Sequence, residues 1–383
     1  MAKQNNNART IYSGSLSEQI MLFMAEVGEC SPSAIYLAFS NYSQKVISNN
    51  LFSLRKRGFL TILGTEKDKI KTCRIRKKEG LPFLNSFPPF VVNRYNSMTS
   101  NHSFASTSVN SKNISSTLRR HRIADTIAFM KNSGVLTGFN CSELSLTTQT
   151  DILDSQPPSF YTSIELKNID KAQKHKIEFT RFVGCVFSSD TVFAIYNISD
   201  GVMKWSEQGE QKTRWFLQDI LSHNSKKSSW KIASIVIYNN DDAILNSVDH
   251  ENSRPEFLSF FNVYKNIYIT PFDKNGIEML KSFLPEGAQD TLKSLVFPKE
   301  LLESSLKLRD CDCDIVDNNI RGFSFLSGNI ARLKRLKSFI ELPSSKNYTF
   351  QIFCYDFQFN FLSEYIQPSE NIEFFPIEGW IFT

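Results

Sequence analysis

The segment Asn41–Leu60, NYSQKVISNNLFSLRKRGFL, decides how the first part of this chain folds. It opens with polar residues, and apolar residues then recur at the three- and four-residue spacing of a helix over 42–57. We expect the buried side of this helix to consist of Ile47, Leu51 and Leu54. Gly58 is expected to end the helix, because glycine tolerates the backbone turn found there. Residues 59–63, FLTIL, then predict a strand.

Two further helices are expected before this segment, and short polar residues mark where all three begin. The first helix follows Ser15 and ends at Gly28, and the second follows Ser31, which stands before a proline. We expect Ser40 or Asn41 to cap the third. After the strand over 59–63, a charged turn leads to a return strand over 70–75, so that a two-stranded hairpin completes the predicted module.

This order of three helices and a hairpin resembles the winged-helix DNA-binding domains of MarR-type proteins. The resemblance is carried by the ending Leu-Arg-Lys-Arg-Gly-Phe-Leu over 54–60, and it covers a domain predicted at residues 14–80. It implies that the third helix enters the major groove of double-stranded DNA. Hydroxyl and amide side chains are expected at base edges, and cations at phosphates. The expected DNA-contacting residues are Tyr42, Ser43, Gln44, Ser48 and Asn49 in the helix and its opening turn, the cations Lys45, Arg55, Lys56 and Arg57, and the wing cations Lys67, Lys69 and Lys71.

The positive charge is concentrated in this module. Ten Lys or Arg and only two acids lie between Arg55 and Lys78, although the whole chain carries a formal charge of only +5. A winged helix that contacts protein through a solvated basic face is the alternative interpretation. The charge imbalance favours a polyanion as the partner.

Residues 95–117 are expected to form a linker or a long exposed loop, because fifteen of these twenty-three positions are Ser, Thr or Asn. A larger α/β domain with a mixed sheet is predicted over 118–383, and it begins with a helix over 118–132. Its predicted strands are 182–187, 192–198, 230–238 and 262–270, its later helices are 211–221 and 277–283, and the alternating Phe and polar residues over 348–383 predict a strand pair.

One alternative places nuclease chemistry in the larger domain. Asp154, Glu165 and Lys167 resemble the metal site of PD-(D/E)xK nucleases, with Asp151 as a second choice for the first carboxylate. In such a site two carboxylates hold Mg²⁺ or Mn²⁺ and the lysine helps to activate water. The local pattern opposes this, since Thr162 and the residues after it predict a capped helix, whereas the motif needs a strand.

A second resemblance extends over the larger domain. The strands at 181–184 and 192–197 resemble those of the plasmid replication-relaxation proteins of Gram-positive mobile elements, which pair a winged helix with a nuclease-like fold. In that family these strands carry acids, whereas Val183 or Gly184, and Tyr196 with Ile198, stand here. The resemblance therefore implies a degenerate PD-(D/E)xK fold without its metal site, and so a domain kept for binding or assembly.

Composition limits the remaining possibilities. The chain of 383 residues is 41% hydrophobic and contains 33 Phe, which predicts a core of sheets packed through Phe. No run is long enough to span a bilayer, and seven scattered Cys without a signal peptide predict a cytoplasmic setting with reduced thiols. We expect no membrane partner, no cofactor and no metal, except Mg²⁺ or Mn²⁺ under the nuclease alternative.

Three functional hypotheses result. The first is a sequence-specific, non-catalytic double-stranded DNA-binding protein of a plasmid or conjugative element. It would be a homodimer that acts in replication, mobilisation or transcriptional control, with other plasmid-transfer or replication proteins as further partners. The second is the metal-dependent nuclease, and the third is a transcriptional regulator whose larger domain senses a ligand.

Overall fold

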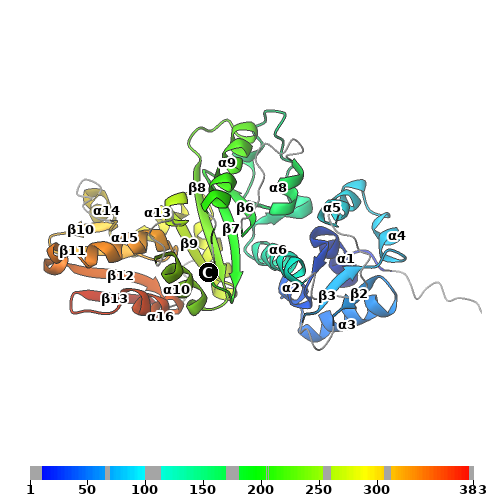
Figure 1. Cartoon of the computed structure of the whole chain (residues 1–383), viewed down its shortest axis with the longest axis horizontal. Helices are drawn as coiled ribbons and strands as arrows, with labels where there is room; N and C mark the ends of the chain where they lie inside the picture. The colour runs from blue at the N-terminus through cyan, green and yellow to red at the C-terminus, as the bar shows by residue number, and fades with distance from the viewer. Residues whose placement is uncertain are drawn as a thin grey trace, which may run out of the picture. The chain divides into compact units, whose positions relative to one another are not determined.

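The computed structural model describes residues 11–64, 70–99, 114–169, 181–203, 205, 207–252, 260–305 and 312–378. The chain divides into two compact units. The first comprises Met1–Ser142 and Phe160–Lys171, and the second comprises Glu143–Ser159 and Ala172–Thr383. Figure 1 shows the helices and strands of both units, coloured along the chain. Helices and sheets with parallel and antiparallel pairs confirm the predicted α/β class.

The first unit opens with three helices and a small antiparallel sheet. Its elements in chain order are α1 (Leu16–Val27), β1 (Glu29–Cys30), α2 (Pro32–Ala38), α3 (Gln44–Lys56), β2 (Leu60–Leu63) and β3 (Thr72–Ile75). The sheet has the order β1-β3-β2, so that β3 pairs with a neighbour on each side. Helix α3 therefore leads directly into the hairpin formed by β2 and β3 (Figure 1).

The predicted helix ends agree with the structure in the first two helices. Ser15 and Ser31 cap α1 and α2 by accepting backbone N–H groups of Glu18 and Ala34, and Gly28 ends α1 with a positive φ of 74°. The expected caps of α3 are wrong. Ser43 caps this helix instead, because the preceding residues turn back on α2 through a bond from the Tyr42 N–H to the Phe39 carbonyl at 2.9 Å.

The expected linker contains parts of two helices. Helix α5 (Pro89–Thr99) occupies its first residues and α6 (Ile114–Asn132) its last, while residues 100–113 lie outside the described part. Helix α6 packs on α2 and β1, so the domain boundary predicted at 118 is also wrong. The other elements of this part of the chain are α4 (Gly80–Leu84), β4 (Leu136–Thr137), the 3₁₀ turn Gly138–Asn140, β5 (Ser159–Thr162) and α8 (Ser163–Ile169).

The second unit contains a mixed sheet in which β6 (Phe182–Ser188), β7 (Thr191–Ser199), β8 (Lys231–Tyr238) and β9 (Ile267–Pro271) are neighbours in that order. The first two strands form an antiparallel hairpin, and β8 and β9 then run parallel to β7. Strand β9 starts later than expected, because α11 (Phe260–Val263) precedes it. The surrounding helices are α7 (Ile152–Ser155), α9 (Glu207–Asn224), α10 (Asp241–Asn252), α12 (Lys274–Phe283), α13 (Ala288–Ser294) and α14 (Lys299–Ser305).

The rest of the second unit builds another sheet, with the order β10-β11-β12-β13. Its elements are β10 (Ile315–Asp317), β11 (Ile320–Ser324), α15 (Ile330–Ile340), the 3₁₀ turn Pro343–Asn347, β12 (Thr349–Tyr355), α16 (Asp356–Ile366) and β13 (Ile372–Ile377). The last three strands are parallel, so α16 is the crossover between β12 and β13. The strand pair predicted over 348–383 is present as β12 and β13, but the helix α16 that separates the two strands in the chain was not predicted.

Aromatic side chains fill the core of the second unit, as the Phe content predicts. Tyr268 and Phe283 stack with ring centroids 5.1 Å apart, and Phe193 meets both of them edge-on. Beside the other sheet, the buried rings of Phe325 and Phe361 stack with centroids 6.1 Å apart. Such pairs add stability beyond the area that they bury.

Candidate nucleic-acid interface

Helix α3 has two faces of opposite character. Ile47, Leu51 and Leu54 are buried and seat the helix on the rest of the first unit, as the sequence predicts. The other face is exposed and contains no acidic residue. The exposed side chains on this face and in its opening turn are those of Tyr42, Ser43, Gln44, Lys45, Val46, Ser48, Asn49, Phe52, Arg55 and Lys56. We call this set the α3 face.

Three of the residues expected to contact DNA already have partners within the protein. The Ser43 hydroxyl accepts the Val46 N–H at 3.4 Å, and the Ser48 hydroxyl shares a hydrogen bond with the Tyr36 hydroxyl at 2.8 Å. The Arg57 guanidinium lies 5.1 Å from the centre of the Phe59 ring and is half-buried. These contacts orient the three side chains and reduce the number of groups that they can offer to a partner.

The most exposed large apolar residue of the α3 face is Phe52. Its side chain is 66% exposed, and Val46 on the same helix is 42% exposed. At 100° per residue, Phe52 lies within about 60° of Lys45, Asn49, Arg55 and Lys56 around the helix. An aromatic ring thus lies near the middle of the cationic and amide groups. The sequence analysis did not predict Phe52 as a contact residue. The helical period nevertheless places it away from the buried Leu51 and Leu54, and so on the exposed side.

The hairpin adds further cations. Lys71 is exposed at the start of the return strand, whereas Lys67 and Lys69 lie outside the described residues. Beyond β3, the three consecutive cations Arg76, Lys77 and Lys78 are also exposed. Much of the positive charge counted in the sequence therefore faces solvent.

Arg74 is the exception, because it belongs to a buried ion cluster. Its Nε and Nη2 donate to the two carboxylate oxygens of Glu29 at 3.0 and 3.1 Å. The Nε of Arg120, on α6, donates to the same carboxylate at 3.0 Å. This cluster joins β1, β3 and α6, and it withdraws one of the ten cations from any contact with a partner.

A buried histidine lies beside this cluster. The His121 ring Nε2 is 2.9 Å from the Thr72 hydroxyl, so α6 and β3 are linked a second time. Burial lowers the pKa of His121 to about 4, since the charged imidazolium loses its hydration there. The ring is therefore neutral at physiological pH and contributes no positive charge to the interface.

The candidate nuclease residues have structural partners in two different units. The Asp154 carboxylate accepts hydrogen bonds from the Ser225 hydroxyl and the Lys226 N–H, and Asp151 pairs with the exposed Lys226 ammonium at 2.6 Å. Glu165 belongs to the first unit. In the part of the chain that is described, no group of three or more His, Cys, Asp or Glu side chains is arranged to hold a metal ion.

Glu165 lies in the first turn of α8, which is capped as the sequence predicts. Its carboxylate accepts the Thr162 N–H at 2.8 Å, and the Thr162 hydroxyl accepts the Glu165 N–H at 3.2 Å. This reciprocal pair is a capping box. The same carboxylate forms an ion pair with Arg94 of α5. Lys167 is exposed on α8, so Glu165 and Lys167 do not share the strand that the nuclease motif requires.

The positions that carry acids in the replication-relaxation proteins hold buried or apolar groups here. Val183 and Gly184 lie in β6, and Tyr196 and Ile198 lie in β7. The Tyr196 hydroxyl donates to the buried Glu210 of α9 and is 3.0 Å from the Tyr264 hydroxyl. Burial, with Glu210 close by, raises the pKa of Tyr196 well above its usual value.

Comparisons with models of known protein families, with curated proteins and with solved structures gave no significant match to this chain. Among the described residues, no helix has both the length and the apolar character needed to cross a membrane.

Proposed function

We propose that the first unit binds double-stranded DNA through the α3 face and that the chain is a sequence-specific, non-catalytic DNA-binding protein. The observation that carries this proposal is the division of α3 into one buried apolar face and one exposed face with cations, amides and no acids. The order of α1, α2, α3 and the β2–β3 hairpin is also that of a winged helix, in which the third helix enters the major groove.

The chemistry of the α3 face supports a division of labour between its side chains. Lys45, Arg55 and Lys56 would meet phosphates, which supply affinity and orientation. Gln44 and Asn49 carry amides of the kind that pair with adenine in the major groove. Amide side chains are thus the better candidates for base recognition, because the Ser43 and Ser48 hydroxyls already have partners.

Phe52 would add a contact of a different kind. Thymine is the base that presents a methyl group in the major groove, and apolar side chains, Phe among them, can contact it. An exposed Phe between the amide and cationic groups of the α3 face therefore favours a site that contains A·T pairs. Two copies of the chain on adjacent half-sites would supply the affinity that one short helix cannot.

The biological setting that we propose is a plasmid or conjugative element, with a role in replication, mobilisation or transcriptional control. It follows from the resemblance of the strands at 181–184 and 192–197 to those of replication-relaxation proteins. The absence of acids at Val183, Gly184, Tyr196 and Ile198 supports a second unit that serves binding or assembly.

The direct test measures binding of a fluorescent random-sequence DNA duplex by anisotropy at several salt concentrations. The test variant combines Lys45→Gln, Arg55→Gln and Lys56→Gln. The matched control removes the same charge from exposed positions in the second unit, with Lys274→Gln, Lys299→Gln and Lys346→Gln. The slope of log K against log salt concentration should become less negative by roughly 0.9 for each phosphate contact that is lost.

We expect the α3 variant to lose affinity and salt dependence while the control retains both. Equal binding by the two triple variants would refute the proposal. Selection of bound sequences from a random duplex library then tests specificity. If no preferred sequence is recovered, the proposal of sequence-specific binding is wrong.

A further inference from the structure

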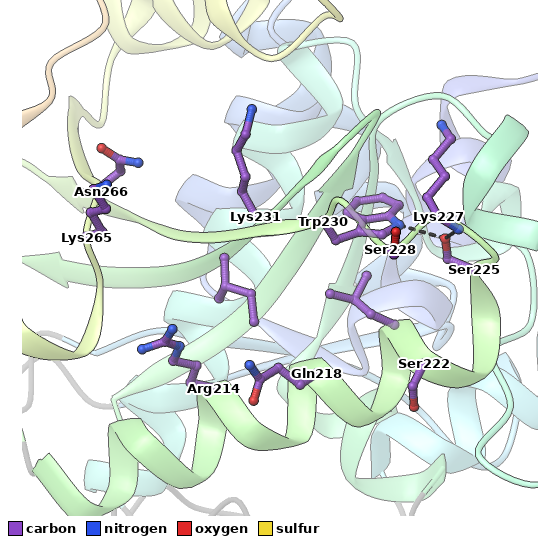
Figure 2. Close-up of a pocket in the computed structure, with 12 residues that line it drawn as sticks. Arg214, Gln218, Ser222, Ser225, Lys227, Ser228, Trp230, Lys231, Lys265 and Asn266 are labelled. Atoms are coloured by element: carbon purple, nitrogen blue, oxygen red, sulfur yellow. Dashed lines mark hydrogen bonds between the residues drawn. The ribbon is translucent and has the colours of Figure 1, made fainter.

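A hollow of about 700 Å³ lies within the second unit, between α9 and the amino ends of β8 and β9. Lys231 begins β8, and Lys265 and Asn266 immediately precede β9, so the parallel strands bring these residues to one edge of the sheet. Figure 2 shows Arg214, Gln218 and Ser222 following one another along α9, with Trp230 across from them and the Lys231 side chain pointing away from the helix. We call this hollow the α9 groove. Its volume is within the range of small-molecule sites, about 300–1,000 Å³.

The α9 groove is strongly cationic. Arg214, Lys227, Lys231 and Lys265 line it, and none of the twelve lining residues that the structure describes is acidic. The ammonium of Lys231 meets the Asp190 carboxylate at 2.7 Å, but both side chains are at least half exposed. Such solvated pairs are weak, so an anionic ligand can compete for this lysine. The ligand that complements this lining carries negative charge.

Two of the other cations are held in position by backbone carbonyls. The Arg214 Nη1 donates to the Val263 carbonyl at 3.0 Å. The Lys227 ammonium donates to the carbonyls of Asp154 and Ser189, each at 3.3 Å. Carbonyls orient these groups without cancelling their charge. The guanidinium and ammonium groups each have further N–H donors beyond the one or two that are used.

A tryptophan provides an aromatic surface beside these cations. Trp230 lines the α9 groove and is half-buried. Its indole N–H donates to the Ser225 hydroxyl at 2.7 Å, and its ring meets Phe187 edge-on at 6.2 Å. These contacts fix the orientation of the ring. Cations combined with a fixed aromatic ring are typical of surfaces that hold nucleotides through phosphate and base.

We propose that the α9 groove binds a nucleotide, with its phosphate held by cations that line the groove and its base against Trp230. The nucleotide is either free in solution or part of a single strand, because both present the same phosphate and base. This site is separate in sequence and chemistry from the α3 face, and the inference does not depend on duplex binding by α3.

The test uses the full chain with Lys45→Gln, Arg55→Gln and Lys56→Gln, so that the α3 face contributes little to binding. A fluorescent ten-residue oligothymidylate is the probe, and binding is followed by anisotropy. Unlabelled oligothymidylate, ATP, inorganic phosphate and polyglutamate are the competitors. We expect the probe to bind, and we expect oligothymidylate or ATP to displace it at concentrations at least tenfold below those of phosphate or polyglutamate.

Three groove variants are compared in this background. Lys231→Gln with Lys265→Gln should weaken probe binding at least tenfold, whereas Lys299→Gln with Lys346→Gln, which removes the same charge elsewhere, should change it less than twofold. Trp230→Leu should weaken binding about fivefold or more, and Trp230→Phe should retain most of it. Circular dichroism establishes that each variant is folded.

Three results would overturn the proposal. One is absence of probe binding at low salt in the folded α3 variant. Another is equal weakening by the groove and control charge variants. The third is displacement by phosphate or polyglutamate at the same concentration as by oligothymidylate and ATP, which would mean that the groove responds to charge alone. Preference for ATP or for oligothymidylate identifies the source of the nucleotide.

Discussion

The Nε of Arg120 donates to the carboxylate of Glu29 at 3.0 Å, although the two residues are 91 positions apart in the chain. Glu29 also accepts two bonds from Arg74, so a single carboxylate balances two buried guanidinium groups. Removal of one member of a buried ion cluster is costly, because the remaining charges lose their counter-ion while they stay shielded from water. Glu29 therefore provides the ionic link between α6 and the sheet, beside the hydrogen bond between His121 and Thr72.

Glu29→Ala is expected to destabilise the first unit by about 3 kcal/mol or more. All four tryptophans lie beyond residue 171, so tryptophan fluorescence reports on the second unit. Amide hydrogen exchange in α2 and α6 provides the measurement for the first unit. Glu303→Ala, which removes an exposed acid in the second unit, is the control. Protection of α6 that is unchanged in Glu29→Ala would show that the cluster contributes little.

The stability of the first unit should depend on pH through His121. Its pKa is lowered to about 4 in the folded chain, against about 6.5 when unfolded. Between these values only the unfolded chain binds the proton, so stability is lost as the pH falls from 6.5 towards 4, by up to about 3 kcal/mol.

The measurement is urea unfolding followed by far-ultraviolet circular dichroism at pH 7.5, 6.0 and 5.0. The chain is compared with His121→Gln, whose amide can still bond to Thr72 but does not titrate. Asp125 complicates the raw profile, since burial raises its pKa to about 7 and its contribution has the opposite sign. The difference between the two proteins isolates His121. A pH-independent difference would contradict the assigned pKa.

Glu165→Ala separates the structural role of this residue from a catalytic one. It removes the capping box of α8 and the partner of Arg94, so we expect a loss of about 1–3 kcal/mol in the stability of the first unit. Glu165→Gln retains the cap and should lose less. Supercoiled plasmid incubated with Mg²⁺ or Mn²⁺ should stay intact with every one of these proteins. Cleavage by the unaltered chain that disappears in Glu165→Gln and Asp154→Asn would instead support the nuclease.

Phe52 should read thymine methyl groups in a selected binding site. Replacing individual thymines by deoxyuridine, which lacks only the methyl group, is expected to weaken binding by the unaltered chain severalfold at one or two positions. Phe52→Ala should bind more weakly and should no longer distinguish the two bases there. If deoxyuridine has no effect on an otherwise tight complex, duplex binding by α3 stands and the role of Phe52 is wrong.

Local signals in the sequence predict the first part of the fold well. Ser15, Gly28 and Ser31 define helix ends through contacts within a few residues, and Ile47 with its partners follows the helical period. The same reasoning fails for α5, where polar composition indicates a loop, and it starts the helix predicted over 118–132 four residues later than α6 begins. Helices α5 and α6 are stabilised by packing on α1 and α2, which no short window of sequence contains.

The C-terminal stretch shows another limit of periodicity. Phe357, Phe359 and Phe361 alternate with polar residues, which favours a strand, but they lie in α16. The buried positions of that helix include Phe361, Leu362 and Tyr365, at helical spacing. This stretch therefore contains both a two-residue and a helical period, and the prediction followed the two-residue period of a strand. The α9 groove could not be predicted at all, because it joins residues from α9, β8 and the start of β9.

The attachment of α6 to β1 and β3 sets a lower limit on the fragment that can be expressed to test the proposed DNA binding. A piece cut at residue 80 would retain Glu29 and Arg74 without Arg120, and would expose the side of α2 that α6 covers. Such a piece is expected to aggregate or to be degraded. A recombinant version that includes α6 and α8, through residue 171, should behave as an autonomous domain.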